Sequence, residues 1–213
     1  MIRTGLAWSA VLVLTALAIS AGVWSVISDA HVATHWNAAG EADGWMPKGL
    51  ALLMMPGFMV LIAALIGGLT AVLPLRGNLE ASRAVVLVGW IGTLGLLLLV
   101  HLFVVLNALG VPVGISVVHA AVAVLIMALG NLMAKSRRNW LVGVRTPWSL
   151  SSDDAWVASN RVAGWGFVGT GALSLLGLVV SMNVAVNLLL AGLFASIVMS
   201  VIVSYRVWKR DTG

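Results

Sequence analysis

The 213-residue chain contains four long stretches without any Asp, Glu, Lys or Arg, and these constrain its fold more than any other feature. They cover residues 4–28, 49–75, 84–134 and 162–205, which are 25, 27, 51 and 44 residues long. One membrane-spanning helix needs about 20 apolar residues. The two shorter stretches therefore predict one helix each, and the two longer stretches predict two each. We expect an all-α, polytopic membrane protein with six transmembrane helices in a single membrane domain, residues 1–213.

Turn sequences inside the two longer stretches set the expected helix ends. Leu-Gly-Val-Pro at residues 109–112 divides the first stretch, and Ser-Met-Asn at residues 181–183 divides the second. Glycine and proline are the strongest local signals for such breaks. The expected helices cover about residues 5–28, 49–74, 84–109, 112–134, 153–181 and 184–207. Two polar loops remain between them, at residues 29–48 and 135–161.

Positive charge is distributed unevenly between the two sides that this arrangement creates. If the amino terminus is cytoplasmic, eleven of the 12 Lys and Arg residues fall on the cytoplasmic side, and Lys48 alone falls outside. Cytoplasmic loops of membrane proteins carry such an excess of Lys and Arg. We therefore expect both termini and loop 135–161 to be cytoplasmic, and loop 29–48 to face outward.

Composition excludes several classes of protein. The chain is 61% hydrophobic and only 9% charged, which excludes a soluble domain of this length. It has no cysteine, so disulfides, thiolate nucleophiles and Cys-ligated metals are excluded. The net charge of +5 does not indicate direct binding of nucleic acid, because no large basic domain lies outside the predicted spans.

Loop 135–161 has the features of a folded surface. Arg-Thr-Pro-Trp at residues 145–148 predicts a compact turn, because proline fixes φ and disfavours helix in the residue before it. Ser151 is the expected N-cap of the next helix, with Asp154 at the capping-box position. We expect that helix to begin at Ser152 or Asp153 and to continue into the membrane without a break.

Two blocks of sequence resemble the signature of the SdpI-type bacteriocin-immunity family of small bacterial membrane proteins. The first block is HWNAAGEADGWMPK at residues 35–48, and the second runs from Gly130 through KSRRN and GVRTPWSLSS to Arg161. Family members commonly have Thr-His-Arg where this chain has Ser-Asn-Arg at residues 159–161. The proline that often precedes the first block is also missing, so the entry to that loop is expected to differ.

The resemblance implies a protein of the bacterial cytoplasmic (inner) membrane that protects against a membrane-acting peptide or protein toxin. We expect no catalytic residue and no cofactor, with zinc at the outer loop as the alternative. The implied partners are a secreted toxin, lipid and, in some family members, a cytoplasmic repressor-type protein through which the loop 135–161 would signal. The outer residues implied to bind are His35, Trp36, Asn37, Asp43 and Lys48. The cytoplasmic residues are Asn131, Arg138, Asn139, Arg145, Thr146, Pro147, Trp148, Trp156 and Arg161.

Two histidines inside the predicted membrane spans add to the outer binding candidates. His101 lies eight residues before Leu109, and His119 lies seven residues after Pro112. At 1.5 Å per helical residue, both lie about 10–12 Å below the outer face. An ionisable side chain inside the membrane is a functional hypothesis by default. The alternative is a neutral imidazole hydrogen-bonded to a neighbour such as Asn107 or to a backbone carbonyl.

The outer loop also suggests a metal site and a docked conformation. His31 and His35 are four residues apart, so a helical turn would place both imidazoles on one face. With Asp43 they have the ligand types that zinc prefers, although the spacing matches no defined zinc motif. We expect the loop to dock on the helix ends. Burial of Trp36 and of Trp45 would each stabilise the docked loop by a few kcal/mol.

Two other functions remain open at this point. A metal-dependent membrane enzyme would use the outer histidines. A small transporter or flippase-like protein is the other. Three helices per half would give the two halves opposite orientations in the membrane, as in transporters built from inverted repeats.

Overall fold

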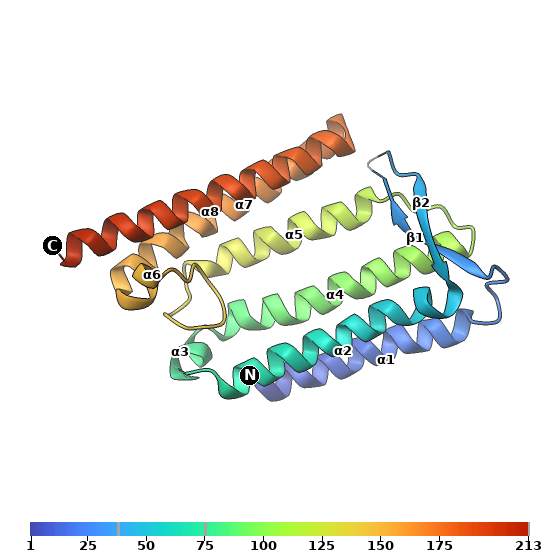
Figure 1. Ribbon diagram of the computed structural model, residues 1–213, viewed down its shortest axis with the longest axis horizontal. Helices are drawn as coiled ribbons and strands as arrows, with labels where there is room; N and C mark the ends of the chain where they lie inside the picture. Colours follow the sequence, from blue (N-terminus) through green and yellow to red (C-terminus); the bar gives the residue numbers. More distant parts are fainter. Residues whose placement is uncertain (38, 75, 213) are drawn as a thin grey trace. The chain divides into compact units, whose positions relative to one another are not determined.

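The computed structural model describes residues 1–37, 39–74 and 76–212, and most of this chain is helical (Figure 1). Six of the described helices are long and apolar enough to cross a membrane. They are α1 (Ile2–Val23), α2 (Lys48–Val72), α4 (Arg83–Ala108), α5 (Ser116–Met133), α7 (Asp153–Val180) and α8 (Met182–Thr212). The short elements are β1 (His31–Trp36), β2 (Ala42–Pro47), α3 (Arg76–Ala81) and α6 (Pro147–Ser151). The predicted all-α class with six transmembrane helices is confirmed.

The chain forms two compact units. The hairpin unit contains Ile2–Gly67 and Trp90–Val122, and therefore holds the strands β1 and β2. The loop unit contains Met1, Gly68–Gly89 and Ala123–Gly213, and therefore holds the second motif block. Helices α2, α4 and α5 contribute to both units, because the divisions fall within these helices.

Loop 29–48 contains a β-hairpin, and the helical turn considered for His31 and His35 is wrong. His31 pairs with Pro47 and Ala33 pairs with Trp45, and the register then shifts so that His35 pairs with Gly44. The β1 sequence HVATHW contains the β-branched and aromatic residues that favour strands.

Asn37 closes the hairpin turn. Its side-chain Oδ1 accepts hydrogen bonds from the backbone N–H of Ala39 at 2.9 Å and of Glu41 at 3.0 Å. Its backbone N–H donates to the Glu41 carbonyl oxygen at 2.9 Å. Asparagine readily makes such side-chain bonds to nearby backbone groups, so Asn37 itself holds Ala39 and Glu41 in place.

The first helix ends at Val23, five residues before the predicted end at Ser28. The ammonium group of Lys48 donates to the carbonyl oxygens of Trp24 at 3.0 Å and Ile27 at 2.9 Å. Both carbonyls lie in the chain after α1, where no regular secondary structure pairs them, and Lys48 provides their hydrogen bonds from the start of α2. The chain can therefore turn early into β1.

Two other helix ends differ from the prediction by more than three residues. Helix α5 begins at Ser116 instead of 112, because the turn after α4 is longer: Gly110 has φ +77°, and the Asn107 amide donates to the Val113 carbonyl at 3.3 Å. Helix α8 continues to Thr212 instead of ending at 207. Its last turn carries Lys209 and Arg210, and cations at a helix carboxyl end are favourable.

The core of the hairpin unit joins β1 to two transmembrane helices. Val32 is buried together with Leu52 of α2 and Val104 of α4. The Trp36 ring meets the Phe103 ring edge-on, with 4.5 Å between centroids. The hairpin is therefore packed on its own unit, as the docking prediction required for Trp36.

In the loop unit, α7 and α8 run side by side and the short α6 precedes them (Figure 1). Helix α7 begins at Asp153 and continues to Val180, as predicted. Its N-cap is Ser152, whose side chain accepts from the Ala155 backbone N–H. The prediction of Ser151 as the N-cap is wrong, because Ser151 is the last residue of α6.

Candidate functional site

The HWN hairpin, residues 31–47, presents a polar pair on its surface. The His35 Nδ1 atom on β1 lies 2.5 Å from Oδ1 of Asp43 on β2. The two side chains are 72% and 44% exposed. A Cβ atom on the opposing Gly44 would lie 2.9 Å from the Cβ of His35, so only glycine leaves room there. The structure thus brings together two residues that the first motif block identified.

Other residues of the first block hold the hairpin in place. Lys48 binds two backbone carbonyls and also lies over the Trp24 ring, 5.6 Å from its centroid. Trp36 faces the core, while Trp45 is 57% exposed. The expectation that both tryptophans dock is therefore wrong for Trp45, since the end of β2 is exposed. Exposed Trp45 is a surface feature that the sequence reasoning missed.

The zinc ligands considered from the sequence are not gathered into a site. His31 lies at the base of the hairpin opposite Pro47, whereas His35 lies beyond the register shift. Within residues 1–37, 39–74 and 76–212, no group of three or more His, Cys, Asp or Glu side chains could hold a metal ion. His35 and Asp43 are a pair without His31.

His101 is buried inside the hairpin unit and connects three helices. Its Nε2 atom lies 3.1 Å from the hydroxyl of Ser20 on α1, and that hydroxyl donates to the Leu52 carbonyl of α2 at 2.8 Å. One nitrogen of the imidazole is therefore hydrogen-bonded, as the alternative to a functional role required, but its partner is Ser20 and not Asn107. Asn107 instead donates to backbone carbonyls of its own helix end and turn. His119 on α5 is also buried.

The RTPW segment, residues 134–152, is folded around buried polar side chains. Asn139 Oδ1 accepts from the backbone N–H of Leu141 at 2.8 Å and of Val142 at 2.9 Å. Its amide nitrogen donates to the Arg137 carbonyl at 2.7 Å. The hydroxyl of Ser149 donates to the Val144 carbonyl at 2.6 Å. These hydrogen bonds satisfy backbone N–H and C=O groups that would bind water in an open loop.

Helix α7 supplies the surface on which the segment lies. Trp156 is buried, and its indole N–H donates to the Ser136 carbonyl at 3.0 Å. Asn160 accepts from the Val144 backbone N–H at 2.9 Å. The backbone at Gly143, with φ +107°, passes close to the side chains of Trp156 and Asn160. A Cβ atom on Gly143 would lie 2.6 Å from Asn160 Oδ1.

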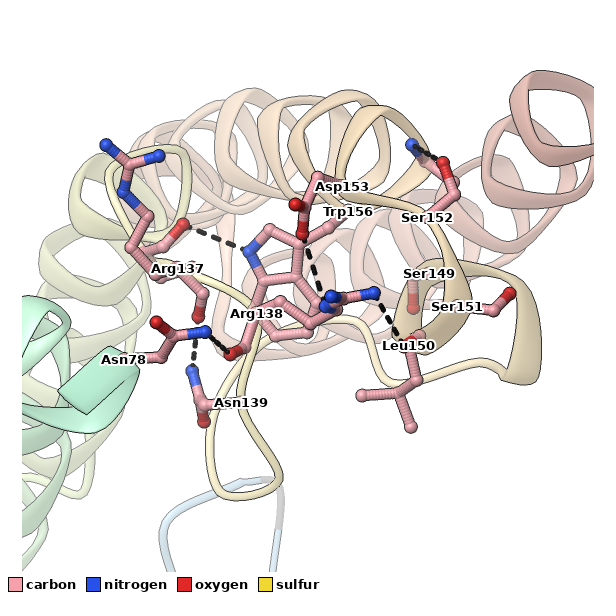
Figure 2. Close-up of polar contacts among 12 residues, drawn as sticks. Asn78, Arg137, Arg138, Asn139, Ser149, Leu150, Ser151, Ser152, Asp153 and Trp156 are labelled. Atoms are coloured by element: carbon pink, nitrogen blue, oxygen red, sulfur yellow. Dashed lines mark hydrogen bonds and ion pairs between the residues drawn. The ribbon is translucent and has the colours of Figure 1, made fainter. Parts of the chain in front are cut away.

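Arg138 joins three parts of the loop unit (Figure 2). Its Nε atom lies 3.2 Å from Oδ1 of Asp153, and its Nη1 atom donates to the Leu150 carbonyl at 3.1 Å. Its own carbonyl accepts from the amide of Asn78 on α3 at 2.7 Å. Arg138 therefore stabilises the segment, and its guanidinium is already engaged by groups of the chain.

The RTPW residues themselves divide into structural and exposed groups. Thr146 is the N-cap of α6, and Pro147 takes the first helical position. The hydroxyl of Thr146 contacts the hydroxyl of Ser204 on α8. Trp148 packs edge-on against Tyr205, with 5.1 Å between centroids. Arg145 is exposed, and its guanidinium donates to the carbonyl of the preceding turn.

Among the described residues, three hollows in the loop unit lie next to residues of the second motif block. A largely apolar cavity of about 470 Å³ is bordered by Arg145, Thr146 and residues of α7 and α8. A second hollow of about 520 Å³ contains Asn131 and Arg161, which come from opposite ends of the second motif block. The structure therefore brings these two predicted residues together, and adds Lys135 to them.

Comparisons with known proteins match both motif-bearing regions. Residues 135–205 match the model of the SdpI/YfhL protein family, and residues 11–60 match that of a domain of unknown function, DUF1648. The chain is 25% identical over 172 residues to the immunity protein SdpI of Bacillus subtilis (strain 168), covering 80% of this chain and 83% of that protein. No solved structure matches the chain. The family match and this relative together confirm the resemblance to the SdpI-type immunity family that the two motif blocks indicate.

Proposed function

We propose that this protein is an immunity protein of the bacterial cytoplasmic membrane, which protects the cell from a secreted, membrane-acting peptide or protein toxin. The observation that carries the proposal is the HWN hairpin, which exposes a carboxylate–imidazole pair and Trp45 on an ordered support. The similarity to an immunity protein over four fifths of the chain supports it.

The hairpin has the chemistry needed to meet such a toxin. A membrane-acting peptide presents apolar side chains together with polar or cationic groups. Trp45 offers a large apolar contact, and tryptophan is among the residues that contribute most to protein interfaces. Asp43 offers a carboxylate whose position is fixed by His35 and by the paired strands.

The experiment is a protection assay in toxin-sensitive cells that express the protein. Asp43→Asn, His35→Ala and Trp45→Ala should each reduce survival, while the amount of protein in the membrane stays unchanged. His31→Ala is the matched control, because His31 is also exposed on the hairpin but outside the pair. Full protection by both Asp43→Asn and His35→Ala would contradict a role for the pair in binding.

We also propose that the RTPW segment signals to a cytoplasmic protein. Arg145 is exposed next to Trp140, which is 46% exposed and whose carbonyl oxygen holds the guanidinium at 2.8 Å. Arginine and tryptophan are enriched at interface hot spots. A double variant, Trp140→Ala with Arg145→Ala, should keep its protection but lose the toxin-dependent change in transcription, measured by RNA sequencing. An unchanged transcriptional response would reject the signalling role.

Transport ranks below immunity for a structural reason. In many transporters with inverted repeats, broken helices at mid-membrane form the substrate site. Here each of the six spans is one continuous helix between its bounds, and α2 continues through Pro56. A liposome flux assay separates the two functions, because solute movement by the purified protein would favour transport.

A further inference from the structure

The hollow that contains Asn131 and Arg161 is a groove between the carboxyl end of α5 and the first half of α7, and we call it the α5–α7 groove. Asn131 and Lys135 line one side, and Arg161 and Trp165 line the other. We propose that this groove binds an anionic phospholipid, with the phosphate at the basic end and an acyl chain along the apolar end.

The floor of the groove is backbone. Gly130 of α5 and Gly164 of α7 are so close that a Cβ on Gly130 would lie 2.7 Å from the Gly164 carbonyl oxygen. A Cβ on Gly164 would lie 2.6 Å from the carbonyl oxygen of Gly130. Small residues allow helices to approach in this way. Because no side chain rises from the floor, the space between the flanking side chains stays open.

Among the described residues, no acid is paired with the positive charge at the basic end of the groove. Asn131, Lys135 and Arg161 are all exposed, and within the described ranges their side chains form no ion pair or hydrogen bond. Asp153, an acid earlier on α7, is engaged by Arg138. An ammonium, a guanidinium and an amide offer donors to phosphate oxygens.

The other end of the groove is apolar. Trp165 lies one helical turn after Arg161, and Val168 follows on the same side of α7. Trp165 is 74% exposed, and α7 carries no charge after Arg161. Exposed tryptophan beside basic residues is typical of the boundary between headgroups and hydrocarbon.

The arrangement favours phospholipid over a free phosphate ion. A phosphate ion would use only the cationic end, whereas a phospholipid also covers Trp165 and Val168. Basic pockets between transmembrane helices are known to hold anionic lipid headgroups. The volume of about 520 Å³ lies within the range of roughly 300–1,000 Å³ that is usual for small-molecule sites.

The test uses the purified full chain in detergent and measures bound lipid by native mass spectrometry. Phosphatidylglycerol should remain bound and phosphatidylcholine should not. The double variant Lys135→Gln, Arg161→Gln should weaken phosphatidylglycerol binding about tenfold, because two charge-assisted contacts are lost. Trp165→Ala should also weaken it, although it removes no charge.

A matched control separates this site from general charge effects. Lys209→Gln, Arg210→Gln removes the same charge from the last turn of α8, outside the groove, and should leave binding unchanged. Equal losses in both double variants, or equal retention of both lipids, would overturn the proposal. Displacement of the lipid by an equal concentration of inorganic phosphate would assign the groove to the free ion instead.

Discussion

Asn160 holds the RTPW segment through an amide at a position where the resemblance to the family would lead us to expect a histidine. It is fully buried, its Oδ1 accepts from Val144, and its Nδ2 donates to the Trp156 carbonyl at 2.9 Å. The histidine common at this position in the family would also offer one acceptor and one donor when neutral. The Asn160 amide makes both bonds and cannot gain a proton near neutral pH. The position is therefore a fixed anchor for the RTPW segment in this chain.

Gly143 should be intolerant of a side chain for two reasons. Gly143→Ala would place a Cβ in a left-handed conformation and within 2.8 Å of the Trp156 ring. The matched control is Gly110→Ala, which has φ +77° but meets no atom within 4 Å. Both variants should lose about 1 kcal/mol of stability from the backbone, and Gly143→Ala should lose more. Thermal unfolding in detergent measures this, and equal melting temperatures would contradict the predicted clash.

The hairpin is an element whose stability depends on contacts outside its own strands. An isolated two-stranded hairpin is only marginally stable in water. Here Val32 and Trp36 pack against α2 and α4, and Lys48 binds the carbonyls that lead into β1. These contacts give the pair of His35 and Asp43 a fixed support.

Lys48→Met should loosen this element, because it removes both hydrogen bonds to the chain before β1 and leaves two carbonyls without their partner. Amide hydrogen exchange across residues 24–36 should become faster. Lys209→Met, at the far end of α8, is the control and should leave that exchange unchanged. If Lys48 instead contacts a ligand directly, Lys48→Met will reduce protection while exchange in the hairpin stays the same.

For the whole molecule, six spans and the distribution of Lys and Arg predict one orientation in the membrane. Eleven of 12 basic residues lie on the side that would contain both termini and the RTPW segment. The positive-inside rule counts Lys and Arg close to the spans, which describes most of these residues. The immunity proposal requires this orientation, since the HWN hairpin must face the toxin.

Cysteine labelling of intact cells tests the orientation, because the chain has no natural cysteine. Ala38 lies outside the described residues, so the exposed neighbour Ala39 carries the outer label. Ala39→Cys should react with a membrane-impermeant maleimide, and Ser151→Cys should react only after permeabilisation. The opposite pattern would reverse the orientation and remove the basis for toxin binding at the hairpin.

Sequence alone determined the number of spans, the two motif loops and the start of α7. These are local properties: a bilayer requires long charge-free helices, and a serine followed by acids marks a helix start. Tertiary structure decided which motif residues are exposed and which are structural. Arg138 and Trp156 look alike in the sequence as candidates for binding, yet their partners are Asp153 and the Ser136 carbonyl. Such partners depend on how distant segments pack, and a short strand such as β1 needs its pairing strand and core to form.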